Sequence, residues 1–389
     1  MLRILLINSV CGVGSTGRIC TDLADEMNRL GHECKIAYAR GDVPEKYKHY
    51  AVRIGNKNSV MRHALSARLF DNGGFCSTRE TKKLIEQIKT FDPDIIHLHN
   101  LHGYYINIEI LFKYLAAANK RIIWTLHDCW SFTGHCAYFE YIGCEKWKCG
   151  CGKCPQIGAY PKSYRDRSKK NYEKKKKAFS DINNMTLATP SKWLAELVDR
   201  SFMGKYPTEV IYNGIDTDVF KPTENSFRKE NNIEDKKIIL GVANIWEKRK
   251  GLDDLIKLSD MLSSDYKLVV VGKLPGGKLP ENILHIERTD SVFELAGIYS
   301  AADVFVNPTY EDNYPTTNLE AQSCGTPVIT YKTGGSVESV PAENVVPQGD
   351  INMMRKLIDT DLKIKDTCFD KKEMIKEYVK LYCVKNQNK

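Results

Sequence analysis

Carboxylates, hydroxyls and a proline gather in one short stretch, EDNYPTTNLEAQSCGTP, at residues 311–327. Its carboxylates belong to Glu311, Asp312 and Glu320. Pro315 suits the first turn of a helix, because the N–H that it lacks would have no partner there. Thr316 and Thr317 follow it, so two hydroxyls stand beside the free backbone N–H groups of the helix start. This combination predicts a binding site for an anion.

Basic residues follow an apolar run at residues 237–245, which is typical of a buried strand. They are Lys248, Arg249 and Lys250, and the sequence after them is GLDDLI. Cations at the end of such a strand can neutralise a diphosphate. An exposed basic turn is the alternative interpretation.

Glycines add two further loops suited to phosphate. In residues 3–19, RILLINSVCGVGSTGRI, a strand pattern passes through Gly12, Gly14 and Gly17 into a helix. Glycine lets the backbone approach a ligand closely, and a helix N-terminus favours negative charge. A second glycine turn, TGGSVES, covers residues 333–339. Glycine in such turns also serves packing, so this signal is weak by itself.

A cysteine-rich segment, GHCAYFEYIGCEKWKCGCGKCP, interrupts the regular pattern at residues 134–155. A Cys-x2-Cys pair with two more thiols within twenty residues fits a closed tetrahedral zinc site. The predicted ligands are Cys136, Cys144, Cys151 and Cys154, and Cys149 is spare. Such a zinc would be structural, pinning a loop that looks too poor in apolar residues to order itself. Unpaired loop thiols are the alternative.

Three histidines cluster in IIHLHNLHGYY, at residues 95–105. His97 and His99 alternate on one face of a strand and could form a metal pair. No acidic partner is near in the sequence, so we favour roles in a loop and in lining a cleft. His99 and His102 are candidates for contact with a substrate.

Composition indicates a globular protein: 42% of the 389 residues are hydrophobic and 27% are charged. No apolar run approaches the ~20 residues that span a bilayer. The odd count of 13 cysteines favours a reducing compartment, so we expect a cytoplasmic protein. Residues 1–190 carry a net charge of +12 and the rest −4. Nine basic residues lie in residues 161–177, which indicates either a solvated helix face or contact with a membrane or polyanion.

Apolar runs rich in Val and Ile alternate with helical stretches in two series, as in parallel sheets covered on both faces. The runs of the first series are residues 3–9, 33–39, 95–100, 121–128, 185–191 and 208–214, and those of the second are residues 237–245, 267–272, 283–288, 303–309 and 327–331. We predict two doubly wound α/β domains, residues 1–213 and 214–370, with a ligand cleft between them. Residues 129–167 form an excursion from the first domain. A helix at about 371–389 is expected to pack back on it.

With these motifs in this order, nearly the whole chain resembles retaining glycosyltransferase family 4, whose fold is GT-B. The resemblance implies two Rossmann-like domains facing a central cleft. Asp312 and Glu320 have the spacing of the family's Glu-x7-Glu motif before CGTP, with Asp in place of the first Glu. The resemblance implies that Asp312 meets the donor sugar, that adjacent Glu311 shares this role, and that Glu320 meets the ribose.

The remaining family positions match in part. Lys250 matches the lysine on the diphosphate, whereas Asn244 occupies the arginine position, so Arg249 is expected to compensate. The resemblance further implies an active-site role for His127 in TLHD. The other donor-binding residues that it implies are Gly14, Ser15, Gly272, Thr316 and Thr317.

The implied function is a retaining transfer of a hexose from a UDP- or GDP-linked sugar to a glycan acceptor in bacterial surface polysaccharide synthesis. The acceptor would be polyprenyl-linked or soluble, and no cofactor would take part in catalysis. The basic segment, with Tyr104, Tyr105, Tyr160 and Tyr164, predicts peripheral binding to the anionic inner face of the cytoplasmic membrane. The alternatives are a nucleotide-sugar epimerase or glycan phosphorylase of the same fold, or a zinc-containing nucleic-acid-binding protein. Few aromatic residues interleave with the basic segment, so no nucleic-acid partner is expected.

Overall fold

The structure is a computed structural model of the chain, and it describes residues 1–367 and 369–383. The chain divides into two compact units. Unit 1 comprises Met1–Ile211 and the chain from Ile375 onward, and unit 2 comprises Tyr212–Met374. The end of the predicted C-terminal helix, residues 384–389, lies outside the described residues.

Unit 1 is built on a seven-stranded parallel sheet in the order β3-β2-β1-β4-β5-β6-β7. Its strands are β1 (Arg3–Ile7), β2 (Glu33–Tyr38), β3 (Ala51–Arg53), β4 (Ile95–Leu98), β5 (Arg121–Thr125), β6 (Met185–Thr189) and β7 (Thr208–Val210). The helices of its continuous part are α1 (Gly14–Arg29), α2 (Lys57–Phe70), α3 (Thr78–Phe91), α4 (Ile108–Ala117), α5 (Ser168–Phe179) and α6 (Lys192–Asp199). Side-chain caps begin several of them: Asn56 accepts from Ser59 N in α2, and Asn107 accepts from Ile110 N in α4.

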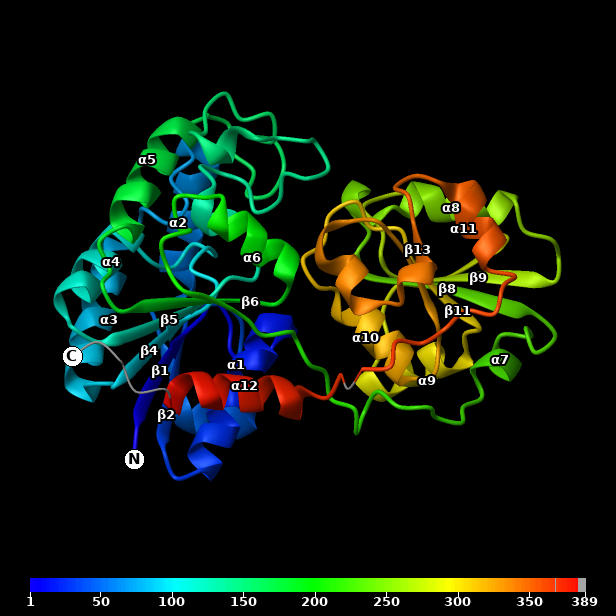
Figure 1. Ribbon diagram of the computed structural model, residues 1–389, viewed down its shortest axis with the longest axis horizontal. Coiled ribbons are helices and arrows are strands. Elements are labelled where there is room, and N and C mark those ends of the chain that lie inside the picture. Colours follow the sequence, from blue (N-terminus) through cyan, green and yellow to red (C-terminus); the bar gives the residue numbers. More distant parts are fainter. Residues whose placement is uncertain (368, 384–389) are drawn as a thin grey trace. The chain divides into compact units, whose positions relative to one another are not determined.

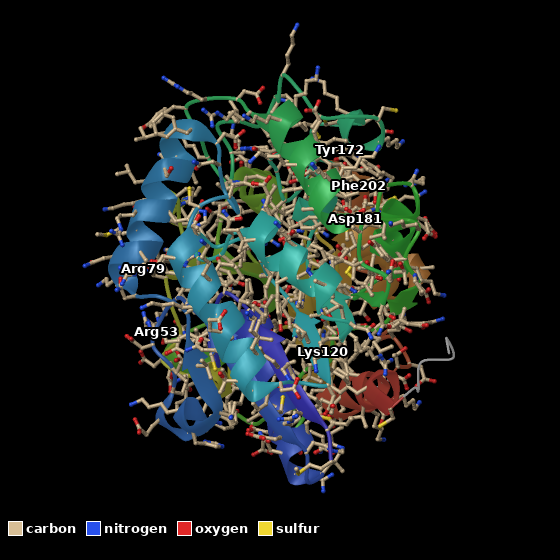
Figure 2. The ribbon with its side chains drawn as sticks, turned by 90° about the vertical axis from the view of Figure 1, so that its left-hand side faces the viewer. Arg53, Arg79, Lys120, Tyr172, Asp181 and Phe202 are labelled. Carbon is tan, nitrogen blue, oxygen red and sulfur yellow. The ribbon has the colours of Figure 1, made fainter. Side chains whose placement is uncertain are left out.

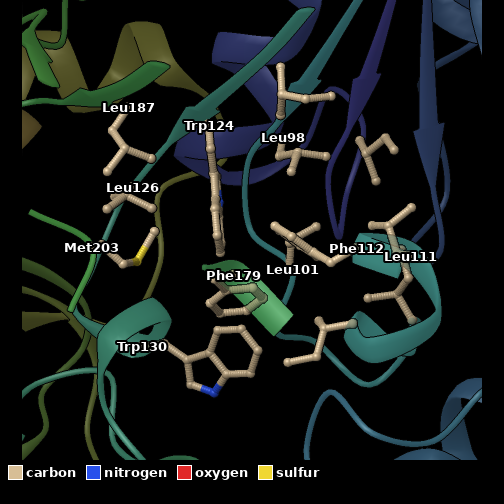
Figure 3. Close-up of a cluster of buried hydrophobic side chains, with 14 of the residues drawn as sticks. Leu98, Leu101, Leu111, Phe112, Trp124, Leu126, Trp130, Phe179, Leu187 and Met203 are labelled. Carbon is tan, nitrogen blue, oxygen red and sulfur yellow. The ribbon is translucent and has the colours of Figure 1, made fainter. Parts of the chain in front are cut away.

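Aromatic side chains fill the core between this sheet and the helices α4 and α5. The Phe112 ring lies 5.3 Å from that of Trp124 and 4.4 Å from that of Phe179, between ring centroids. Figure 3 shows these rings with Trp130 beside Phe179 and with Leu98 and Leu187 from neighbouring strands. The sequence after β5 therefore takes part in the core.

Unit 2 contains a six-stranded parallel sheet in the order β10-β9-β8-β11-β12-β13. Its strands are β8 (Lys237–Ile245), β9 (Tyr266–Lys273), β10 (Ile283–Ile286), β11 (Val304–Asn307), β12 (Val328–Tyr331) and β13 (Val345–Val346). The helices are α7 (Phe227–Glu230), α8 (Leu252–Asp260), α9 (Val292–Ala301), α10 (Thr316–Ser323) and α11 (Ile351–Leu357). Within this unit, α8 and α11 lie on one side of the sheet, and α9 and α10 lie on the other (Figure 1).

Successive residues of the unit 2 strands belong to two different cores. Ile238, Leu240 and Phe305 pack on the side of α9 and α10, whereas Ile239 and Val304 pack on the side of α8. Both faces of the sheet are therefore buried, which explains why its strands are continuous apolar runs. The prediction of two doubly wound, Rossmann-like sheets is confirmed. The edge strands β3 and β13 were missed, because three and two residues are too short for a recognisable pattern.

Helix α12 (Lys371–Cys383) packs its C-terminal part on unit 1 through buried hydrogen bonds. The Tyr382 hydroxyl lies 2.6 Å from His97 Nδ1, and the Tyr378 hydroxyl lies 2.9 Å from Thr125 Oγ1. Arg121 Nη1 donates to the Tyr382 carbonyl at 2.9 Å. These bonds join α12 to β4 and β5 in the middle of the sheet.

Residues 129–167 form an irregular loop with the short 3-10 helices η2 (Trp130–Phe132) and η3 (Lys146–Lys148). This loop contains its own aromatic cluster: Trp147 is 1% exposed, and its ring lies 5.0 Å from Phe139 and 5.4 Å from Phe132. The loop thus contains more buried apolar side chains than the sequence-based prediction allowed, and whether it needs a metal stays a prediction. The cluster could not be recognised from the sequence, because its rings lie seven and eight residues apart and follow neither a helical nor a strand period.

The basic helix α5 is anchored by one of its own lysines. Lys175 is 1% exposed, and its ammonium donates to the carbonyls of Trp130 at 2.6 Å and Thr133 at 3.0 Å. Burial lowers the Lys175 pKa to about 7. On the same helix, Tyr172 packs edge-to-face on Phe202 at 5.3 Å, and Figure 2 labels both residues.

Two residues assigned to a membrane-facing surface are therefore interior residues. Lys175 belongs to the core, and Tyr105 is 1% exposed, with its hydroxyl donating to the Asn100 carbonyl at 2.7 Å. The exposed lysines of α5 are Lys169, Lys170, Lys176 and Lys177. A search of the described residues for a helix with the length and hydropathy of a membrane span found none.

Candidate functional site

The predicted anion site of unit 2 lies where β8 and β11 end. These strands are neighbours in a parallel sheet, so the segments that follow them leave the same edge. The segment after β8 forms η4 (Lys248–Lys250), and the segment after β11 leads to α10. Lys250 Nζ and Asp312 Oδ2 meet there at 2.5 Å, with side chains 22% and 13% exposed. The structure thus joins two candidates that are 62 residues apart.

Arg249 fixes the backbone of the same loop. Its Nη1 donates to the Glu311 carbonyl at 3.1 Å, and its Nε donates to a Glu247 carboxylate oxygen at 3.0 Å. The Arg249 carbonyl in turn accepts from Tyr310 N at 2.7 Å. The Glu311 side chain is buried. Arg249 therefore supports the loop that carries Asp312. Asn244, which occupies the family's arginine position, is exposed.

Helix α10 begins at Thr316, and Pro315 is its N-cap, one residue before the first-turn position predicted for it. Thr316 and Thr317 lie in the first turn, as predicted. Behind the turn, the Gly335 N–H donates to the Asp312 carbonyl at 3.3 Å, so the glycine turn at residues 333–339 holds the same loop. Glu320, farther along α10, accepts from the Tyr299 hydroxyl at 3.1 Å. Burial, and then the Glu320 charge, raise the Tyr299 pKa well above its usual value, so Tyr299 stays a donor.

Gly272 occupies a position in β9 that only glycine can fill. Its φ is +125°, and a Cβ there would lie 1.7 Å from the Ala243 carbonyl oxygen of β8. His285 Nε2 lies 2.9 Å from the Gly272 carbonyl oxygen. The structure thus gives this glycine a packing role, and its predicted contact with the donor stays a prediction.

In unit 1, Gly14 and Ser15 open helix α1, and both are exposed. Gly14 has a φ of +66°, a conformation that L side chains rarely adopt, and no atom lies within 4 Å of the position that a Cβ would take. The glycine is therefore required by the turn rather than by packing, and the space beside it is open.

His127 follows β5 and belongs to a row of histidines. Its Nε2 lies 3.1 Å from His99 Nδ1, and the two rings stack at 5.4 Å. Burial lowers the His127 pKa to about 4, so the ring is neutral at physiological pH. Both ring nitrogens of His97 are already in hydrogen bonds, Nδ1 with the Tyr382 hydroxyl and Nε2 with Thr125 Oγ1, so His97 could bind a metal only by giving one of them up. The metal-pair alternative for His97 is set aside on this ground.

A second pair beside His127 was not singled out from the sequence. His102 Nε2 lies 2.7 Å from Asp128 Oδ2, and Asp128 Oδ1 accepts from Trp130 N at 2.9 Å. Burial would raise the Asp128 pKa, yet His102 and these hydrogen bonds lower it, so the carboxylate is ionised. His99, His102, His127 and Asp128 line one small cavity. The sequence signal was present, because Asp128 directly follows His127.

The four predicted zinc ligands also line one cavity, with His135 among them. Cys136 is hydrogen-bonded to Cys154, and Cys151 Sγ accepts from Gly134 N at 3.2 Å. Within residues 1–367 and 369–383, no three His, Cys, Asp or Glu side chains are placed so that they could hold a metal ion as the structure stands. The spare residue Cys149 is exposed. The zinc therefore stays a prediction.

Comparison with known proteins decides the family. Residues 16–219 match Glycosyltransferase Family 4, and residues 223–381 match Glycosyl transferases group 1. The chain belongs to glycosyltransferase family 4. It is thus a transferase enzyme, as the motif order predicted.

Curated relatives of this glycosyltransferase include proteins named for polysaccharide synthesis. The putative colanic acid biosynthesis glycosyl transferase WcaC of Escherichia coli K12 is 26% identical over 351 residues, covering 87% of this chain and 85% of WcaC. The O-antigen biosynthesis glycosyltransferase WclY of Escherichia coli is 31% identical over 139 residues, which cover 33% of this chain and 38% of WclY.

Solved structures share the fold of the glycosyltransferase at low identity. HepE of Anabaena, in complex with UDP, superposes with a TM-score of 0.68 at 14% identity, covering 98% of this chain and 99% of HepE. Sucrose-phosphate synthase of Thermosynechococcus elongatus gives a TM-score of 0.68 at 16% identity, covering 98% of each chain. The predicted GT-B fold is confirmed.

Proposed function

We propose that this glycosyltransferase transfers a hexose from a nucleoside-diphosphate sugar to a glycan acceptor in the synthesis of a surface polysaccharide, with retention at the anomeric carbon. The names of WcaC and WclY support the surface polysaccharide. HepE, which shares the fold, is in complex with UDP, and this supports a UDP-linked donor ahead of a GDP-linked one.

The contact between Lys250 and Asp312 at the start of α10 is the observation that carries the proposal. The Lys250 ammonium has three N–H donors, of which Asp312 takes one. The others would donate to phosphate oxygens, together with N–H groups of the first turn of α10 and the hydroxyls of Thr316 and Thr317. A diphosphate bound there would meet a cation whose position a carboxylate already fixes.

Asp312 would then serve two partners. One oxygen holds Lys250, and the carboxylate also accepts from hydroxyls of the donor sugar, since charge-assisted bonds of this kind fix orientation. Glu320 would accept from the ribose hydroxyls while Tyr299 holds its other side. Glu311 is buried behind the loop, so its support of Asp312 would be indirect.

His127 would contribute a hydrogen-bond donor to the donor sugar. His99 Nε2 is buried with no partner, and a lone pair is cheaper to bury than an N–H group, so we place the His99 proton on Nδ1. His99 then donates to His127 Nε2, which places the proton of neutral His127 on Nδ1. Gly14 and Ser15, at the open start of α1, would receive the donor through backbone N–H groups.

The transfer step would depend on electrostatic stabilisation. As the glycosidic bond to the diphosphate breaks, negative charge would grow on the leaving phosphate, and Lys250 and the N-terminus of α10 would stabilise it. Arg249 would assist indirectly, by holding the loop through its bond to the Glu311 carbonyl. The proposed transfer step uses no cofactor.

The acceptor would be a glycan carried on a polyprenyl lipid, with a soluble glycan as the second form of the same substrate class. The exposed lysines of α5 and exposed Tyr164 support binding at an anionic membrane surface, which would be the inner face of the cytoplasmic membrane.

The test is a panel of UDP- and GDP-linked hexoses, scored by thermal shift and by slow hydrolysis of the donor. We expect one nucleotide sugar to raise the melting temperature and to be hydrolysed. NMR recorded before the released sugar mutarotates should show that its anomeric configuration is retained. Stabilisation by no nucleotide sugar, or an inverted product, would contradict the proposal.

A further inference from the structure

His135 combines deep burial with one unused ring nitrogen. Its side chain is 1% exposed, and its Nδ1 lies 2.6 Å from Asp71 Oδ1. The Nε2 atom, on the opposite edge of the ring, is buried and has no hydrogen-bond partner. A ring nitrogen left without a partner in the interior costs free energy, so its position calls for an explanation.

The partner on the other edge of the ring is firmly placed. Asp71 ends α2, its φ of +50° is left-handed, and its Oδ2 accepts from Arg167 N at 2.8 Å. Its carbonyl accepts from Asn171 Nδ2 at 2.5 Å. Because Asp71 accepts at His135 Nδ1, the histidine proton lies on Nδ1 and a lone pair remains on Nε2. A carboxylate that orients a histidine in this way is the usual outer partner of a metal-binding histidine.

His135 lines the same cavity as the four cysteines, whereas Asp71 does not. His135 therefore lies between Asp71 and the group of thiols. Three of these sulfurs are already in hydrogen bonds: Cys136 with Cys154, Cys154 with the Gln156 backbone, and Cys151 with Gly134 N. Backbone N–H groups that donate to sulfur also stabilise thiolates. The fourth, Cys144, lies on the cavity wall without such a bond among the described contacts.

We propose that this cavity is a structural zinc site whose ligands are His135 Nε2 and the thiolates of Cys136, Cys151 and Cys154. The geometry replaces Cys144 of the sequence-based set by His135. On binding, the metal would take the place of the thiol protons, and rotation about the Cα–Cβ bonds would bring the sulfurs to the ~2.3 Å that zinc requires. The site is independent of the proposed sugar transfer, since it shares no residue with the proposed donor site.

Zinc would complete a loop that is already partly ordered by its aromatic cluster. Trp147 and Phe139 line the same cavity as the ligands, so the metal would join the apolar cluster to α2 through His135 and Asp71. A closed, partly apolar surrounding of this kind is typical of structural rather than catalytic zinc.

The first test uses the full wild-type chain, purified without added metal and then dialysed with zinc. We expect about one zinc per chain by elemental analysis. X-ray absorption at the zinc edge should show three sulfur neighbours at ~2.3 Å and one nitrogen at ~2.0 Å. No bound zinc, a Cys136–Cys154 disulfide in its place, or a shell of four sulfurs would overturn the proposal.

Variants distinguish the two ligand sets. His135→Ala should abolish stoichiometric zinc, and Asp71→Asn should weaken zinc binding by ~10–100-fold in a chelator competition. Cys144→Ser and the exposed control Cys149→Ser should keep one zinc per chain. Loss of zinc in Cys144→Ser with retention in His135→Ala would contradict the assignment. If a variant fails to fold, the absorption spectrum of the wild type still decides the ligand set.

Discussion

The two units share a doubly wound parallel sheet but prepare their polar groups in opposite ways. Unit 1 buries histidines that are neutral, with pKa values lowered to about 4 for His63, about 3 for His97 and about 4 for His127, chiefly by burial. Unit 2 contains one histidine, His285, and its candidate site is built around the half-buried ion pair of Lys250 and Asp312.

The difference teaches that one fold can present two kinds of chemistry at its strand ends. Neutral imidazoles at low exposure suit hydroxyl groups, because they donate and accept without carrying a charge that must be desolvated. A lysine paired with a carboxylate at a helix N-terminus suits a diphosphate, which needs positive charge that stays in place. In the proposed function, the diphosphate is accordingly assigned to unit 2, and His127 of unit 1 adds an uncharged donor for the sugar that Asp312 also contacts.

The largest expected effect tests the charged site of unit 2. Lys250→Ala should lower turnover by ~10²–10³, with a modest loss of donor affinity, because its charge is needed most when the diphosphate departs. Steady-state kinetics at saturating donor measures the effect. Lys257→Ala, on exposed α8 surface, is the control and should behave like the wild type. Near-wild-type turnover of Lys250→Ala would show that the charged site of unit 2 does not stabilise the departing diphosphate.

A falling pH should destabilise the folded state of unit 1 more than that of unit 2. The histidines of unit 1 have folded pKa values below the ~6.5 of the unfolded chain, so the unfolded state binds more protons below that pH. The stability that they contribute is complete above about pH 6.5 and is lost as the pH falls toward 4, by up to ~3 kcal/mol per histidine. We expect unit 1 to lose hydrogen-exchange protection first.

Hydrogen exchange of peptides from both units between pH 7.5 and 4.5 makes this measurement. His63→Gln should reduce the acid sensitivity of unit 1, whereas His49→Gln, at an exposed position, should leave it unchanged. Loss of protection in unit 2 before unit 1 would show that its ion pairs, and not the buried histidines, set the acid limit.

Glu320 gives a smaller effect that sharpens the role of unit 2. Glu320→Gln should weaken binding of the free nucleoside diphosphate by about tenfold to a hundredfold, as expected for the loss of charge-assisted hydrogen bonds. Tyr299→Phe should weaken it less, because it removes only the bond that orients the carboxylate. Calorimetry measures both. An unchanged affinity of Glu320→Gln would assign the ribose contact elsewhere.

The smallest effect per residue concerns the basic surface of unit 1. Gln at Lys169, Lys170, Lys176 and Lys177 should reduce co-sedimentation with anionic vesicles, at ~1 kcal/mol per lysine. Lys82→Gln with Lys83→Gln, on exposed α3, is the matched control. Binding that is absent from anionic vesicles at low salt would favour the soluble acceptor.

Much of this arrangement could be predicted from local sequence. Strands of parallel sheets can be recognised as apolar runs. The start of α10 next to Pro315 could be predicted because proline lacks the N–H that a helix interior needs. The sequence also predicted Lys250 and Asp312 as site residues, because each follows such an apolar run. The sequence did not predict that these two side chains touch. Their contact depends on β8 and β11 being neighbours in the sheet, although β9 and β10 separate them in the chain.

By itself, the sequence determined the two Rossmann-like sheets, the order of the motifs and the types of chemical group available, because period, turn residues and charge are local properties. Only the tertiary structure decided which groups are buried and paired. It placed Lys175 in the core although the sequence shows it in a run of four lysines, and it brought His135 to cysteines as many as nineteen residues away and to Asp71, 64 residues away. Burial and pairing depend on contacts between distant segments, and no local pattern encodes them.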